Sequence, residues 1–309
     1  MNLPLHVDRA KGMAVVGSGT LVISVDALLI RLAHTESWNV IFWRGIFMAL
    51  SLGTLLFIRH GRRMADTYIR GGRAALFSAL LFGLGSTAFV SSVMFTKVAN
   101  TVVIISSAPL FAALFTWLLR IETVPLRTWL AICSAFFGVG VVFAGSLGGG
   151  GLLGDLIAVL NACAVGGNLT LLRHHQVLDR LPLVCLGGII MALLSLPLAD
   201  PFIVSEKGFL VLGLMGLVQM PLALSLIAQS TRYLPSPEVS LFLLVETILS
   251  PIWVWLVLGE IPPRLTYIGG TIVICTLIIH SWLGLREWSQ AKRVCLEASR
   301  KESPPRHDG

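Results

Sequence analysis

The sequence is poor in charged residues. They make up 13% of the 309 residues, against about 25% in a soluble domain, whereas hydrophobic residues make up 55%. This composition supplies too little polar side chain to cover a surface that faces water. No polar stretch is long enough to fold as a separate domain, and apolar runs of about 20 residues recur almost to the end of the chain. We therefore predict an integral membrane protein.

Motifs of several other protein classes are also absent. The sequence has no Walker A motif, no H-E-x-x-H, no G-x-S-x-G and no paired acids within an apolar run. Its five cysteines include no close pair, and no histidine stands at metal-ligand spacing. The formal charge of +7 comes from Lys and Arg between and after the apolar runs, so it indicates membrane topology rather than nucleic-acid binding. We expect no metal, no cofactor and no enzymatic activity.

Ten apolar segments are long enough to cross a bilayer as helices, since a span needs about 20 apolar residues. Continuous runs of this length exclude an outer-membrane barrel, whose strands alternate and are about half as long. We predict an all-α membrane protein with ten transmembrane helices. The expected spans are 12–33, 39–58, 74–94, 101–119, 128–146, 153–172, 183–199, 208–230, 238–258 and 265–283.

The distribution of Lys and Arg predicts the orientation. If the N-terminus is cytoplasmic, 18 of the 23 basic residues lie beside cytoplasmic span ends, four lie outside, and Arg44 lies within a span. This asymmetry is the positive-inside signal of an inner or plasma membrane protein. Both termini are therefore expected in the cytoplasm, and the lipid bilayer is an obligatory partner.

The two halves of the chain resemble each other when the sequence is shifted by 138 residues. The shift places Trp117 on Trp255 and Glu122 on Glu260, with five identities in twelve positions. This period corresponds to five spans, and an odd number of spans gives the halves opposite orientations, as in secondary transporters. We expect a cytoplasmic segment 1–11, a first repeat 12–146, a second repeat 153–283 and a polar, basic cytoplasmic tail 284–309.

Several short motifs recur in the order and spacing of a known family. On them the sequence resembles the drug/metabolite transporter superfamily, specifically the EamA-type transporters with two five-helix repeats, over about residues 12–283. The motifs are Ser24-Val-Asp26-Ala-Leu, Phe42-Trp-Arg44-Gly, Ala108-Pro109-Leu-Phe-Ala-Ala through Glu122, Leu244-Val-Glu246-Thr, and Ser250-Pro251-Ile-Trp-Val-Trp255 through Gly259-Glu260.

The resemblance implies a carrier in the inner membrane. Its substrate would be a small organic metabolite, amino-acid-like or otherwise polar or amphipathic, moved by alternating access through a cavity lined by helices 1, 3, 4, 6, 8 and 9. The fold does not select the metabolite. Two other functions stay open, a non-transporting sensor or lipid scramblase and, with less support, an intramembrane enzyme. Small-xxx-small spacing is compatible with a homodimer or with helix packing inside a monomer.

Asp26 and Arg44 are two of the three ionisable residues that stand clear of span ends, and we expect them to form an ion pair. At 1.5 Å per residue both lie about 8–10 Å from the same predicted membrane face. The pair would either fix helices 1 and 2 or bind substrate, Arg44 through an anionic group and Asp26 through a cationic one.

Glu246 is the third such residue, and its span contains no Lys or Arg. A carboxyl group without a counter-ion in a membrane usually takes up a proton. Glu246 is therefore a candidate for proton coupling or for binding a substrate ammonium. The alternative is a protonated side chain that links helices through a hydrogen bond.

Neutral polar and aromatic residues give further substrate-binding candidates. Asn161 and Asn168 lie seven residues apart on one face of span 6, and Gln219 lies in span 8. Their amides suit a polar substrate but would equally link helices. Trp253 would either stack on a ligand or anchor its helix at the interface.

Prolines and glutamates near the span ends are structural or gating candidates. Pro109 and Pro251 lie inside spans, where proline removes a helical hydrogen bond and marks a kink or hinge. Glu122 and Glu260 occupy equivalent span ends beside arginines, Arg264 in the case of Glu260, and are expected to clamp loops.

Overall fold

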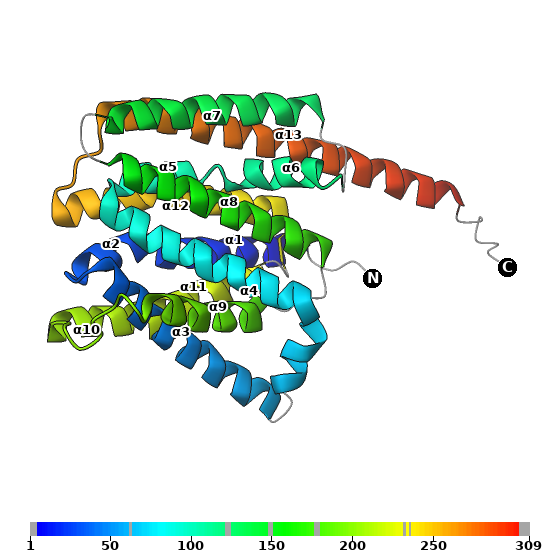
Figure 1. Cartoon of the computed structure of the whole chain (residues 1–309). Coiled ribbons are helices and arrows are strands. Elements are labelled where there is room, and N and C mark those ends of the chain that lie inside the picture. The colour runs from blue at the N-terminus through cyan, green and yellow to red at the C-terminus, as the bar shows by residue number, and fades with distance from the viewer. Residues whose placement is uncertain are drawn as a thin grey trace.

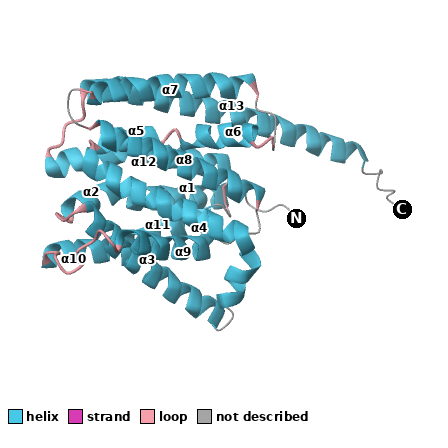
Figure 2. Cartoon of the chain, in the orientation of Figure 1, coloured by secondary structure: helices cyan, strands magenta, loops and turns pink. Residues whose placement is uncertain are grey.

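The structure is a computed structural model that describes residues 5–61, 64–120, 125–147, 151–175, 180–230, 233–234 and 236–302. All regular structure in these ranges is helical (Figure 2). The helices are α1 (Leu5–Ser24), α2 (Asp26–Leu32), α3 (Ser37–His60), α4 (Met64–Phe95), α5 (Val98–Ile105), α6 (Ala108–Leu118), α7 (Leu126–Ser146), α8 (Leu152–His174), α9 (Arg180–Ser195), α10 (Glu206–Gly213), the π-helix η2 (Leu214–Gln219), α11 (Met220–Ser230), α12 (Ser236–Leu258) and α13 (Arg264–Glu302).

These elements make up ten spans, which confirms the predicted all-α membrane fold. Eight segments are long and apolar enough to cross a membrane, and Arg180–Ser195 and Phe242–Leu258 are shorter apolar helices. Span 1 consists of α1 and α2, span 4 of α5 and α6, and span 8 of α10, η2 and α11. Three of the ten spans are thus interrupted.

Prolines account for the interruptions of spans 4 and 8, and a backbone angle marks the interruption of span 1. Pro109 would place its ring against the helical carbonyl of the residue four positions earlier, and α5 ends at that residue, Ile105. In span 8, Pro221 cannot donate a hydrogen bond to the preceding turn, and that turn adopts the wider π geometry. Span 1 breaks at Val25, whose ψ of −2° departs from helical values.

One predicted span boundary is wrong. The helix of span 7 ends at Ser195 rather than at residue 199, because Pro197 disfavours helical geometry in the residue before it. The predicted last span, 265–283, is confirmed as the apolar segment Arg264–Leu283, and its helix continues beyond the span to Glu302, through a segment rich in Arg, Lys, Glu and Ala without proline. This extension projects beyond the bundle (Figure 1). Residues 303–309 lie outside the described ranges.

Helices from the two halves pack in matching pairs. If spans 1–5 are matched with spans 6–10 in order, α3 packs on its own counterpart α9, and α7 packs on its counterpart α13. The contact of α4 with α8 matches that of α1 with α11, and the contact of α6 with α8 matches that of α1 with α12. The packing therefore has the internal symmetry expected of two repeats, and α7 and α13 lie side by side along one edge of the bundle (Figure 1).

Glycines allow the counterpart helices to approach closely. A Cβ on Gly45 of α3 would lie 2.5 Å from the carbonyl oxygen of Gly188 in α9, and the reverse contact would be 2.8 Å. Gly138 of α7 and Gly269 of α13 face each other in the same way. Close approach of small residues is the usual means of helix association in lipid, where burial of apolar surface gives little driving force.

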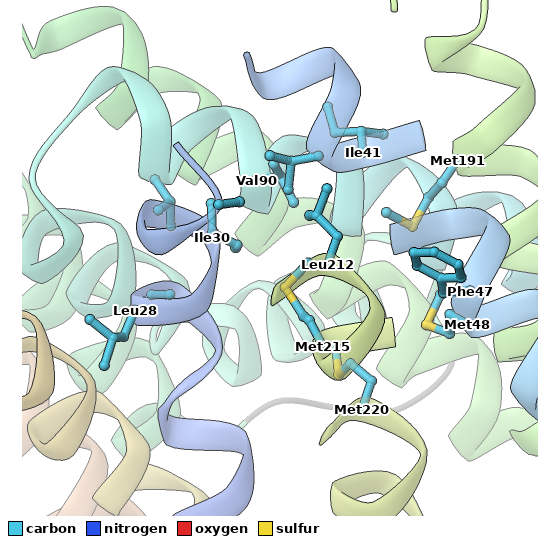
Figure 3. Packing of buried hydrophobic residues seen from close by; sticks show 14 of the residues in the cluster. Leu28, Ile30, Ile41, Phe47, Met48, Val90, Met191, Leu212, Met215 and Met220 are labelled. Atoms are coloured by element: carbon cyan, nitrogen blue, oxygen red, sulfur yellow. The ribbon is translucent and has the colours of Figure 1, made fainter. Parts of the chain in front are cut away.

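The largest apolar cluster surrounds the break in span 1. It includes Leu28 and Ile30 of α2, Met48 of α3 and Met215 of the π-helix, and Figure 3 shows that these side chains come from separate elements. This packing brings α2 together with α3, α4 and η2. The polar side chains described next lie at the same place.

Candidate functional site

Asp26 and Arg44 form a buried ion pair, as predicted. Arg44 Nη2 lies 2.9 Å from Asp26 Oδ2, and Arg44 Nη1 donates to Asp26 Oδ1 at 3.1 Å. Only 1% of the Arg44 side chain and 5% of the Asp26 side chain are exposed, so the pair is shielded from water. Bidentate pairing of this kind is the strong form of an Arg–carboxylate contact. Asp26 is the first residue of α2, so the helix break and the charge pair coincide.

The π-helix closes the other side of Arg44. Arg44 Nη1 also contacts Met215 Sδ at 3.7 Å, and the guanidinium lies 5.8 Å from the ring centroid of Phe89 in α4. One turn after Met215, Gln219 Nε2 donates to the carbonyl oxygen of Val22 at 3.0 Å. Gln219 Oε1 is buried and has no hydrogen-bond partner among the residues that the structure describes. The predicted candidate Gln219 therefore lies beside the broken span 1 with an unused acceptor.

Trp253 and Glu246 of α12 lie near the break in span 1 and the Asp26–Arg44 pair. Trp253 Nε1 donates to Ser24 Oγ at 2.9 Å, at the last residue of α1. Glu246 lies seven residues before Trp253, its side chain is partly exposed, and it is within electrostatic range of both Asp26 and Arg44. Its carboxyl group has no hydrogen bond or ion-pair contact to any residue that the structure describes. Asp26, Arg44, Gln219, Glu246 and Trp253 thus converge from α2, α3, η2 and α12, and we call them the central site.

Asn161 and Asn168 lie elsewhere, in the contact between α4 and α8. Asn168 Oδ1 accepts a hydrogen bond of 2.6 Å from Ser78 of α4. Asn161 is buried, with its Oδ1 3.2 Å from the position that a Cβ on Gly85 would occupy. The structure therefore places both amides between packed helices, and Asn168 links two of them.

Glu260 forms a polar clamp at one end of the bundle, which we call the α2 end. Its Oε2 lies 3.3 Å from Arg31 Nη2, and its Oε1 accepts from the N–H of Val98, the first residue of α5, at 2.9 Å. Arg31 also donates to the carbonyl oxygen of Thr96 at 2.8 Å. The partner of Glu260 is thus Arg31 of the first half and not the neighbouring Arg264. In the folded chain Glu260 lies between Arg31 of α2 and the start of α5. The predicted counterpart, Glu122, lies outside the described residues.

A second buried carboxylate lies near this clamp, and the sequence analysis missed it. Asp155 of α8 is fully buried and accepts hydrogen bonds from Thr96 Oγ1 at 2.7 Å and Asn100 Nδ2 at 3.2 Å. Asn100 Nδ2 also donates to Ser146 Oγ at 2.8 Å. Asp155 stands only three residues inside its helix, so a search for charges clear of the span ends passes over it. The alignment of Asp155, Asn100 and Thr96 at three adjoining span ends was the available signal.

Two cavities open at the α2 end. The larger, of about 680 Å³, is lined by residues that include Arg31, His34, Asn39 and Asp200. The smaller, of about 250 Å³, is lined by Arg31 together with residues such as Asn100 and Ser146. Arg31 lines both cavities, and it lies five residues after Asp26 on α2. The α2 helix therefore connects the cavities with the central site.

The two proline candidates differ in their structural effect. Pro109 is the second residue of α6, immediately after the break in span 4. Pro251 lies inside α12, which continues through it to Leu258.

No group of three His, Cys, Asp or Glu side chains close enough to hold a metal ion occurs among the described residues.

Ten apolar helices, two matching halves and buried charges at broken spans define a multi-pass membrane protein of the inverted-repeat type. The model of the EamA-like transporter family matches residues 11–144 and again residues 152–282. The chain therefore belongs to the EamA-like transporter family, whose members are transporters rather than enzymes.

Comparisons with individual proteins give the fold only. A solved structure described as a crystal structure of a protein matches 90% of this chain and 99% of its own chain, with a TM-score of 0.58 and 16% identity. No curated protein matches the chain. The family model thus shows the family, the solved structure supports the fold, and neither names a substrate.

Proposed function

We propose that this protein is a secondary transporter that moves a small, polar or amphipathic organic metabolite across the inner membrane by alternating access. The observation that carries the proposal is the central site, where ionisable and amide side chains gather at broken helices between the two halves. Discontinuous helices near the bilayer midplane form the substrate and ion sites of inverted-repeat transporters. Intramembrane charges of this kind also mark transport pathways.

The packing supports a mechanism in which one group of helices moves against the other. Counterpart helices meet at glycine-mediated contacts, so the two halves form equivalent interfaces that can exchange between two arrangements. In this proposal both termini are cytoplasmic, the α2 end faces outward, and its cavities form a vestibule. The Arg31–Glu260 contact joins the halves at that end and would act as a gate.

Glu246 is the proposed coupling residue. It lacks a counter-ion of its own, it is partly exposed, and it lies near a pair whose two charges cancel. A carboxyl group in this setting can bind a proton from one side of the membrane and release it to the other as the site changes its exposure. Protons are therefore the proposed coupling ion.

The test is transport by the purified chain in sealed proteoliposomes without ATP. We expect flux of at least one compound from a panel of radiolabelled amino acids and related metabolites, faster than in protein-free vesicles. Parallel vesicles with a fluorescent lipid test for scrambling. Lipid scrambling without metabolite flux would contradict the proposal, and so would the absence of flux for the whole panel from protein that is folded by circular dichroism.

A further inference from the structure

One face of α1 carries an unusual set of small and polar residues opposite α12. Gly17, Thr20 and Ser24 are spaced by three and four residues, so they lie on the same side of the helix. Val16, four residues before Thr20, packs in a cluster with Ile227 of α11 and Val239 of α12, and Ser24 of the same face accepts a hydrogen bond from Trp253 of α12. The face formed by these residues is therefore directed toward α12.

The hydrogen bond between Trp253 and Ser24 fixes the relative depth of the two helices. Spans 1 and 9 are separated by an even number of crossings, so α1 and α12 run in the same direction. Seven residues back from Trp253 is Glu246, and seven residues back from Ser24 is Gly17; each step is about 10 Å along a helix axis. Glu246 therefore lies beside the stretch of α1 between Gly17 and Ser24.

This stretch is open and has unused polar groups. A Cβ placed on Gly17 would meet no described atom within 4 Å. A Cβ placed on Gly12 or Gly19 of the same helix would make close contacts. Thr20 is 1% exposed, and its hydroxyl is buried without a hydrogen-bond partner in the described ranges. The Glu246 side chain is partly exposed and has no partner in the part of the chain that the structure describes. Space, a hydroxyl and a carboxyl group thus occur together.

The chemistry of the neighbourhood selects one class of ligand group. The Asp26–Arg44 pair is neutral as a unit, and Arg44 has already committed both terminal nitrogens to Asp26. Among the described residues, the groups that remain are the Glu246 carboxylate, the buried acceptor Gln219 Oε1, the Thr20 hydroxyl and a single N–H donor, Arg44 Nε. A surplus of acceptors with one negative charge complements a cation that carries N–H donors.

We propose that the space between Gly17, Thr20 and Glu246 binds the primary ammonium group of an organic substrate. The inference rests on the proposed function, since it names the substrate class of the central site. The ammonium pairs with Glu246 and donates to the Thr20 hydroxyl. The indole of Trp253, at the Ser24 end of the space, covers the adjoining part of the substrate. An anionic or neutral compound of the same shape lacks the charge and the donors that this space requires.

Binding to the purified, full-length protein tests the proposal without requiring transport. Isothermal titration calorimetry would compare 2-phenylethylammonium with its neutral analogue 2-phenylethanol and its anionic analogue 3-phenylpropanoate. We expect the ammonium compound to bind at least tenfold more tightly than either analogue. The N,N,N-trimethyl derivative, which has the charge but no N–H donor, should bind several-fold more weakly.

Two pairs of variants locate the binding site. Glu246→Gln should weaken binding of 2-phenylethylammonium at least tenfold, whereas Glu206→Gln, at an exposed carboxyl group in α10, should leave it unchanged. Gly17→Val should abolish binding by filling the space, whereas Gly140→Val, at a helical glycine that also has no neighbour within 4 Å, should leave it unchanged. The Gly17 pair decides the question if Glu246→Gln fails to fold.

Three results would overturn the inference: no binding of the ammonium compound at millimolar concentration, equal binding of the three analogues, or binding that Gly17→Val leaves intact. Failure of the transporter proposal would look different. Ammonium binding that depends on Gly17 but is accompanied by no flux in proteoliposomes would preserve the site and refute transport. Metabolite flux that the ammonium compound does not inhibit would preserve transport and refute the site.

Discussion

Replacing the two members of the Asp26–Arg44 pair one at a time and then together should give strongly non-additive losses of stability. Asp26→Leu leaves the guanidinium of Arg44 buried without its counter-ion, and Arg44→Met leaves the carboxylate of Asp26 in the same situation. Losing one partner of a buried pair costs about 3–5 kcal/mol, whereas replacing both by apolar residues is often close to neutral. We therefore expect each single variant to be much less stable than the double variant.

The exposure of the side chains sets the expected size of the coupling. At 1% and 5% exposure the Asp26–Arg44 pair has no access to water that would screen it, and two large single losses with a nearly neutral double variant correspond to a coupling free energy of more than about 3 kcal/mol. The Arg31–Glu260 contact, with side chains 25% and 13% exposed, provides a matched comparison. Exposed pairs couple by about 0.2–1 kcal/mol, and its own double-mutant cycle should fall near that range.

Unfolding of the purified variants in mixed micelles by added SDS, followed by circular dichroism, would measure both cycles. The cycle removes the side effect of losing the Glu260 contact to the N–H of Val98, because that loss occurs in the single and the double variant alike. Additive losses at Asp26 and Arg44, within about 0.5 kcal/mol, would refute the reasoning. Equal coupling in the two pairs would refute the link between burial and strength.

Three further predictions concern topology, coupling and packing. In a background without the native cysteines, Lys97→Cys should react with a membrane-impermeant thiol reagent from outside while a C-terminal tag stays protected in intact cells; the opposite pattern would exclude the inverted-repeat orientation. Glu246→Gln should lose uptake driven by a pH gradient even at substrate concentrations high enough to offset its weaker binding, where exchange persists, and unaltered pH-driven transport would exclude the coupling role. Gly45→Leu should destabilise the protein by about 1–3 kcal/mol in SDS unfolding because its side chain meets the backbone of α9, whereas Gly140→Ala should be close to neutral; similar effects of the two would contradict the close-approach argument.

Much of the architecture could be predicted from the sequence because it follows from one-dimensional signals. Runs of about 20 apolar residues have only one way to satisfy their backbone in lipid, so the spans and their helical nature were predictable. The Asp26–Arg44 pair was predictable because depth along two adjacent spans can be counted in residues. In both cases the relevant distance is proportional to a number of positions along the chain.

The remaining features depend on contacts between distant segments. Glu260 binds Arg31, 229 positions away, and nothing adjacent to Glu260 in the sequence indicates that partner. The hydrogen bond between Trp253 and Ser24 and the position of Gln219 beside Val22 likewise appear only when span 1 is folded against spans 8 and 9. Asp155 was missed for a related reason, since its burial is produced by neighbouring helix ends rather than by its own position in an apolar run.

The most extensive helix contacts join the two halves, and this affects how the chain is made. As the ribosome delivers helices in order, α1 enters the bilayer long before α11, α3 before α9, and α7 before α13. The first half must wait in lipid with its main packing surfaces uncovered, including the glycine face of α3, although Asp26 and Arg44 can already pair within it. The most extensive helix contacts therefore form only after the second half has been inserted.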